Sequence, residues 1–356
     1  MQVIPFLREL SAATGIAGRE HGVRTVVQEA WRPLVDEIRE DKLGNLIALK
    51  RGSGSGQRPR LMLAAHMDEV GLVVTGIDSG FLRIAPVGGA DRRVLPGLEV
   101  VVHGQRDLPG IVATRPPHVL SSIDRQRTIP WDKLFVDVGL PEATVRQNVA
   151  VGDLISIQAN LLELQNRRVA AKALDDRACV AAVTMALEQL GPVRHTWDIL
   201  AVATTQEEIG LKGATTATYG IGPDLAIALD VTFGAQPGAA DTDTFPLGEG
   251  PTLGIGPNFH PKFTDYIRQL ADRHEFPYHI EATPGVSGTD AWAIQVALEG
   301  IPTALLSLPI RYMHQPIELL DTQDIERTGR LLATIIAELD DGFLSKLAWD
   351  IGAEDE

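Results

Sequence analysis

Histidine and acidic residues recur in this sequence at two kinds of position. Each follows an apolar run that is typical of a buried strand, or begins an apolar stretch that is typical of a helix. The eight residues are His66, Asp68, Asp175, Asp176, Glu207, Glu208, Asp230 and His314. In an open α/β sheet, the carboxyl ends of the strands form the crevice in which ligands bind. We therefore expect these side chains to meet in one site.

Taken singly, these motifs have structural explanations. A His-x-Asp motif is often a hydrogen-bonded surface pair, two adjacent aspartates often cap a helix, and two adjacent glutamates often lie in a solvated turn. Their common placement at expected strand ends and helix starts instead favours a cluster of titratable groups in a pocket.

The cluster has the composition of a metal site without sulfur ligands. Imidazole and carboxylate groups suit a divalent ion such as Zn, Co or Mn, in a site that keeps one position open for water. Three carboxylates and two histidines would leave two divalent ions with one excess positive charge, which a hydroxide would offset. A shared carboxylate holds two such ions about 3.5–4 Å apart, and Asp175 is the natural bridge. The expected ligands are His66, Asp175, Glu208, Asp230 and His314.

The two adjacent glutamates, Glu207 and Glu208, need different roles. Neighbouring side chains leave an extended backbone in opposite directions, so we expect one to bind metal and the other to act as a general base. Asp68 lies two residues after His66, on the same side of an extended segment. We expect its carboxylate to accept the second ring hydrogen of that imidazole and so orient it.

The elements that must position these residues fall into two patterns. Residues 3–10 and 23–31 have helical periodicity, 44–50 predict a strand, and 51–60 predict a hairpin turn. From residue 60 to about 165 the chain shows short β-rich runs broken by Gly, Pro and Asp, with no expected helix. After residue 170 strand and helix patterns alternate, which indicates a helix-covered, mixed but mostly parallel sheet. The sequence thus predicts an α/β domain formed by residues 1–68 and 166–356, interrupted by an all-β domain at 69–165.

Composition excludes several classes of protein. The 356 residues, 44% of them hydrophobic, are enough for a large core, and the net charge of −15 opposes nucleic-acid binding. A single cysteine, Cys179, excludes an internal disulfide and a zinc site built on several thiolates. The start of the chain does not resemble a signal peptide, and no apolar run is as long as a membrane span. We expect a cytoplasmic protein with no membrane partner.

Six segments, taken in order, resemble the tetrahedral (TET) dinuclear metallo-aminopeptidases, the family that includes glutamyl and deblocking aminopeptidases. These segments are AAHMDEVG, AKALDDRA, TTQEEIGLKGA, ALDVT, SGTDA and YMHQPIELLD. The resemblance implies an inserted barrel-like dimerisation domain, dimers that assemble into a tetrahedral dodecamer, and a cis Asp175–Asp176 peptide bond. It also implies the site roles: one ion on His66 and Asp230, the other on Glu208 and His314, Asp175 between them, and Glu207 as general base.

The implied function is removal of N-terminal amino acids from peptides by a water that two divalent ions activate, with Zn or Co expected first and Mn next. Three alternatives remain at this point: a related dinuclear deacylase or carboxypeptidase, an endoglucanase with paired carboxylates, and a non-catalytic shell subunit. The side chain preferred at the substrate's first position does not follow from the sequence.

Overall fold

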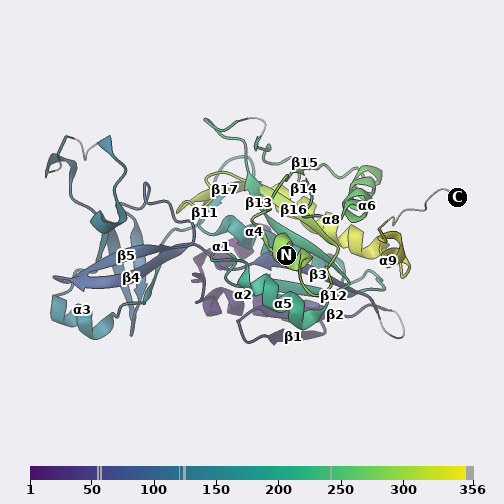
Figure 1. Cartoon of the computed structure of the whole chain (residues 1–356), viewed down its shortest axis with the longest axis horizontal. Coiled ribbons are helices and arrows are strands. Elements are labelled where there is room, and N and C mark those ends of the chain that lie inside the picture. The colour runs from purple at the N-terminus through teal and green to yellow at the C-terminus, as the bar shows by residue number, and fades with distance from the viewer. Residues whose placement is uncertain (54–55, 57, 120, 123–125, 241–242, 350–356) are drawn as a thin grey trace.

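The chain folds into two bodies, an α/β domain and a β-barrel joined to one side of it (Figure 1). The computed structural model describes all residues except 54–55, 57, 120, 123–125, 241–242 and 350–356. Within the described ranges, no helix combines the length and the apolar character needed to cross a bilayer.

The α/β domain is built on an eight-stranded sheet with the order β1-β2-β12-β3-β13-β16-β14-β15. The central strands β12, β3, β13 and β16 are parallel, whereas β1, β2 and β14 pair antiparallel with a neighbour. β15 pairs parallel with β14. The strands are β1 (Glu37–Glu40), β2 (Leu46–Lys50), β3 (Arg60–His66), β12 (Asp198–Thr204), β13 (Leu225–Phe233), β14 (Thr252–Ile255), β15 (His279–Ala282) and β16 (Thr303–Ile310).

Alternate residues of the central strands face two separate cores, as strand geometry requires. In β3, Leu61 and Leu63 pack in the core beneath α1, α2, α4, α6 and α8, whereas Met62 and Ala64 pack against α5 and α7. Because both faces are covered, these strands are apolar throughout rather than alternating with polar residues. The helices are α1 (Val3–Ala12), α2 (His21–Trp31), α4 (Leu174–Gln189), α5 (Lys212–Ile221), α6 (Pro261–Arg273), α7 (Asp290–Gln295), α8 (Thr322–Glu338) and α9 (Phe343–Lys346).

The second body is a closed antiparallel barrel with the order β4-β5-β8-β7-β6-β9, drawn in blue in Figure 1. Its interior holds side chains such as Leu72, Val74, Val102 and Val136. The strands are β4 (Gly71–Asp78), β5 (Phe81–Val87), β6 (Glu99–His103), β7 (Asp107–Ala113), β8 (Phe135–Asp137) and β9 (Leu154–Ile157). The expected fold class, an α/β domain that carries an inserted all-β barrel, is confirmed.

Two local expectations are wrong. The barrel segment contains a helix, α3 (Glu142–Asn148), whose seven residues bury only Val145 and so show no helical periodicity in sequence. The segment 51–60 does not connect a hairpin, because β12 lies between β2 and β3 and pairs with both. Short 3-10 helices are present at η1 (Arg32–Leu34), η2 (Pro117–Val119) and η4 (Trp131–Lys133).

A small sheet next to the barrel ties the returning chain to the C-terminal part. Its strands are β10 (Leu162–Glu163), β11 (Arg168–Ala171) and β17 (Glu318–Asp321), all paired antiparallel. The pairing sets Ala171 opposite Glu318. It therefore brings the start of α4, which follows β11, beside the loop that precedes β17.

Candidate metal centre

The parallel register of the central strands brings the first site residues level with one another. His66 ends β3 and pairs with Thr204, the last residue of β12. The register of β13 with β3 sets Ala228 opposite Ala64, and when it is extended by two residues it sets Asp230 opposite His66. The end of β3 and an interior position of the longer β13 thus present an imidazole and a carboxylate side by side.

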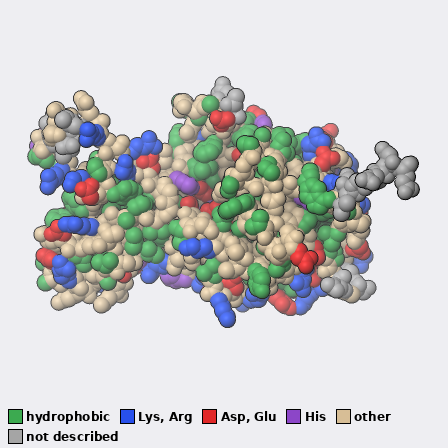
Figure 2. Space-filling model, viewed as in Figure 1, with side chains coloured by type: hydrophobic (Ala, Val, Ile, Leu, Met, Phe, Trp, Pro, Cys, Tyr) green, Lys and Arg blue, Asp and Glu red, His purple; other side chains and the backbone are tan. Residues whose placement is uncertain are grey.

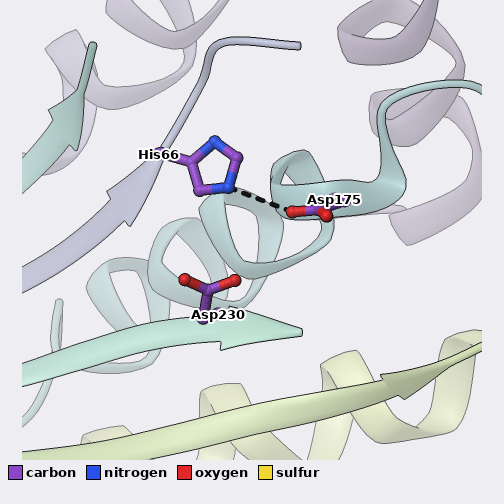
Figure 3. Close-up of side chains that lie close together, drawn as sticks. All are labelled: His66, Asp175 and Asp230. Carbon is purple, nitrogen blue, oxygen red and sulfur yellow. Dashed lines mark hydrogen bonds and ion pairs between the residues drawn. The ribbon is translucent and has the colours of Figure 1, made fainter. Parts of the chain in front are cut away.

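Asp175 joins these two residues from the start of α4 to form a buried triad (Figure 3). The His66 Nε2 atom lies 3.0 Å from Asp175 Oδ1, and the Asp230 carboxylate points from β13 towards both. One ligand atom from each residue lies within 4.8 Å of the others. The three residues are at most 6% exposed.

A second triad shares Asp175 with the first. Asp175 Oδ2 lies 3.4 Å from His314 Nε2, and that nitrogen lies 3.5 Å from Glu208 Oε2. One ligand atom from each of Asp175, Glu208 and His314 also lies within 4.8 Å of the others. Asp175 therefore directs one carboxylate oxygen to each triad, which is the geometry of a carboxylate between two cations.

The start of α4 has an irregular backbone. Asp175 and Asp176 do not have helical φ and ψ angles, and the peptide bond between them is cis, as the family resemblance implied. The Asp176 carboxylate accepts the backbone N–H of His66 at 3.1 Å. Asp176 thus anchors the end of β3, while the side chain of Asp175 belongs to both triads.

Asp68 organises the turn that carries the two glutamates. Its carboxylate accepts the backbone N–H of Glu207 at 3.0 Å and that of Glu208 at 3.2 Å. The expected contact with the His66 ring has an Nδ1 to Oδ1 distance of 3.5 Å, longer than an ordinary N–H···O hydrogen bond. The two glutamates take different positions: Glu208 enters the second triad, and Glu207 Oε2 lies 3.9 Å from His66 Nε2.

Glu318 is a buried residue of the site that the sequence analysis did not identify. Its Oε2 accepts the backbone N–H of Asp175 at 2.9 Å, and its Oε1 accepts that of His314 at 3.0 Å. One carboxylate thus holds the backbone of two residues from the two triads. The only sequence signal is its place in the motif YMHQPIELLD, where it looks like an ordinary strand residue.

A buried ion network fixes the segment that follows β3. The Glu69 carboxylate binds Lys172 Nζ at 2.5 Å, the Arg177 guanidinium at 3.1 Å and the backbone N–H of Gly15 at 3.0 Å. Arg177 also donates to the Met67 carbonyl and to carbonyls at the end of α1. The network therefore ties residues 67–69 to α4 and to the end of α1.

The site carries excess negative charge. Burial, together with neighbouring carboxylates, raises the pKa of Asp230 well above its usual range, that of Glu207 to about 10 and that of Glu208 to about 7, although the nearby His66 lowers all three. Burial would also raise the pKa of Asp175, but hydrogen bonds with His314 and His66 lower it below its usual value.

This charge balance tests whether the residues fit divalent cations. Four carboxylates face two imidazoles in a buried region, and all donors are nitrogen or oxygen. Bound dications would neutralise such a cluster, whereas without them it repels itself. The donor set therefore fits divalent metal.

A cleft of about 580 Å³ is lined by four of the five residues of the two triads, namely Asp175, Glu208, Asp230 and His314. The cleft runs from the candidate metal centre past the end of β13 to β15 and α7. Acidic and histidine side chains are visible on the surface between the barrel and the α/β body (Figure 2). The candidate metal centre is therefore open to a ligand through this cleft.

Comparison with known proteins identifies relatives along nearly the whole chain. The family model described as M42 glutamyl aminopeptidase matches residues 44–331. A lysyl aminopeptidase of Pyrococcus furiosus is 38% identical over 339 residues, which are 94% of this chain and 96% of the relative. An aminopeptidase from the archaeon Desulfurococcus kamchatkensis has a TM-score of 0.90 at 34% identity, with 98% of each chain covered. The TET1 peptidase of Pyrococcus horikoshii, described as assembling into a tetrahedron or an octahedral shell, has a TM-score of 0.84 at 30% identity, with 95% of this chain and 100% of that one covered.

Proposed function

This chain belongs to the M42 glutamyl aminopeptidase family and is a metal-dependent aminopeptidase, and from that premise we propose which of its residues perform the reaction. His66 and Asp230 hold one divalent ion, Glu208 and His314 hold a second, and Asp175 bridges them. The observation that carries the proposal is the pair of ligand triads that share Asp175. Nitrogen and oxygen donors favour Zn or Co, with Mn as the next choice.

The ions, when bound, supply Lewis acidity that lowers the pKa of a water and polarises the scissile carbonyl. Glu207 is the general base: it takes a proton from the attacking water and delivers it to the leaving amine. Its carboxylate lies close to His66 without belonging to either triad. Asp68 positions Glu207 and Glu208 through their backbone N–H groups.

Metal removal and choice of substrate test this proposal together. The protein is dialysed against a chelator, reloaded with Zn or Co, and assayed for amino acid release from free and N-acetylated peptides. We expect activity that disappears with the metal, returns with it, and requires a free amine. Activity that is indifferent to metal would discard the ligand assignment, and metal-dependent cleavage of blocked peptides would favour a deacylase or an endopeptidase.

The geometry does not suit a glycoside hydrolase. Glycosidase carboxylates flank the bond from opposite sides at about 5–9.5 Å. Here the carboxylates converge with two histidines into triads of ligand atoms within 4.8 Å. A carboxypeptidase would release the other end of the peptide in the assay above.

We further propose that the chain forms a homo-oligomer in which dimers assemble into a tetrahedral dodecamer through the domain at 69–165. The TET1 relative supports this, as does a groove of about 710 Å³ on the barrel surface beside Ile111, which is 52% exposed. Light scattering tests the assembly, and a monomer would contradict it. A cytoplasmic location stays a prediction from the sequence.

A further inference from the structure

The cleft that leads away from the candidate metal centre contains one acidic residue that the mechanism does not use. Glu281 on β15 lines the cleft together with apolar side chains. Among the described residues that line it, none is a lysine or an arginine, so no neighbouring cation within the cleft balances this carboxylate. The apolar lining includes Val231, Phe233, Val286, Trp292, Leu305 and Met313.

Two threonine hydroxyl groups hold the Glu281 carboxylate in place. Thr232 of β13 donates to Oε1 at 2.7 Å, and Thr252 of β14 donates to Oε2 at 2.6 Å. An ionised carboxylate has about four acceptor positions, so each oxygen can still accept another hydrogen bond. The carboxylate is therefore oriented in advance and can bind a ligand group in the cleft.

The spacing along β13 between Asp230 and Thr232, the threonine bonded to Glu281, is comparable with the length of a long basic side chain. Thr232 follows Asp230 by two residues in the same strand, so their Cα atoms lie about 6.6 Å apart on one face. A lysine side chain has five bonds of about 1.5 Å from Cα to Nζ and reaches about 6 Å when extended. If the scissile carbonyl of the substrate lies beside Asp230, the side-chain ammonium group of the substrate's first residue comes near Glu281.

The charges and the apolar lining favour the same substrate. The apolar walls suit the methylene groups of lysine or arginine, and the carboxylate suits their cationic ends. A glutamate side chain would be repelled there, and a leucine side chain would leave Glu281 without a charged partner.

We propose that this cleft binds the side chain of the first substrate residue and that Glu281 selects a basic one, lysine or arginine. The inference rests on the proposed metal centre, which locates the scissile carbonyl. Glu281 is thus a residue that determines specificity at the same site.

The test compares wild type with Glu281→Gln as metal-loaded, assembled enzymes. Glutamine keeps an oxygen for one threonine, and the other hydroxyl can turn to accept from the new amino group, so we expect the variant to fold. The ratio kcat/KM is measured for the Lys, Arg, Leu and Glu aminoacyl-p-nitroanilides, with metal content and Tm recorded for each protein. Glu249→Gln, at an exposed glutamate that does not line the cleft, is the matched control.

We expect wild type to prefer Lys and Arg, and the Lys to Leu ratio to fall on the order of 10- to 100-fold in Glu281→Gln with unchanged metal content. A wild-type preference for Leu or Glu would overturn the inference while leaving the aminopeptidase function intact. An equal loss for Lys and Leu would also overturn it, because Glu281 would then only connect strands. If wild type cleaves none of the four substrates, the proposed function fails, and the Tm shifts caused by lysinamide and leucinamide decide the inference separately: a larger shift with lysinamide supports it, and an equal or smaller one overturns it.

Discussion

Replacement of Glu318 by glutamine tests whether one buried carboxylate sets the geometry of both triads. Its two oxygens accept the backbone N–H groups of Asp175 and His314, and the residue is only 2% exposed. Glutamine has nearly the same shape but only one acceptor oxygen. One of the two backbone N–H groups would therefore face an amino group and lose its partner.

The size of the effect follows from that lost hydrogen bond. A hydrogen bond to a charged group contributes about 1.5–3 kcal/mol, and about 1.4 kcal/mol corresponds to a tenfold change in an equilibrium constant. His314 is half-buried and belongs to one triad only, so its position depends more on this bond than that of Asp175 does. We expect the ion held by Glu208 and His314 to bind about 10- to 100-fold more weakly, with a smaller change at His66 and Asp230.

Competition between the metal-stripped protein and a chromophoric chelator measures both affinities with Zn or Co. Glu299→Gln, at an exposed glutamate in the loop before β16, is the control for loss of one surface charge. Two affinities equal to those of wild type, in a variant with unchanged Tm, would refute the reasoning. If the affinities for both ions fell equally, the effect of the substitution would instead act through the bridging residue, Asp175.

Three further predictions concern the base, the buried ion network and a titrating glutamate. Glu207→Gln should keep two bound ions and lose kcat on the order of 10²- to 10⁴-fold; metal analysis beside steady-state kinetics checks this, and retained turnover would disprove the role. Arg177→Met leaves Glu69 buried with fewer partners and should lower the free energy of unfolding by about 3–5 kcal/mol; urea denaturation that shows a loss below about 1 kcal/mol would contradict it. Burial raises the pKa of Glu20 from its ordinary value to about 7, so the folded chain binds a proton in that range more readily than the unfolded chain does. Stability due to this group is therefore present at low pH and lost as pH rises through about 7. Glu20→Gln does not titrate, so its Tm minus that of wild type should increase from about pH 5 to about pH 8. A Tm difference that stays constant over this range would exclude the effect.

Much of the candidate site could be predicted because it depends on local patterns. His66 and Asp230 follow continuous apolar runs, and such runs indicate parallel strands covered on both faces. Strand ends in this kind of sheet meet at one edge, so a residue's place after its run predicts its place in the fold. The family resemblance then divided the ligands between two ions, and composition alone would not have done so.

Other features depend on contacts between distant segments. Helix α3 escaped prediction because a seven-residue helix with one buried side chain has no readable period. The position of β12 between β2 and β3 is set by long-range pairing, which turn residues such as those at 51–60 do not encode.

The sequence by itself predicted the two kinds of domain, the sulfur-free set of candidate donors and the residues that would supply it, because residue type and local periodicity carry that information. Only the tertiary structure decided the distances at which those donors converge in two triads around Asp175, and which other carboxylates support them. Glu318 reaches two ligand backbones, and Glu281 enters the cleft, because strand pairing sets segments far apart in the chain side by side. Distances between such segments are a property of packing, and no local pattern records them.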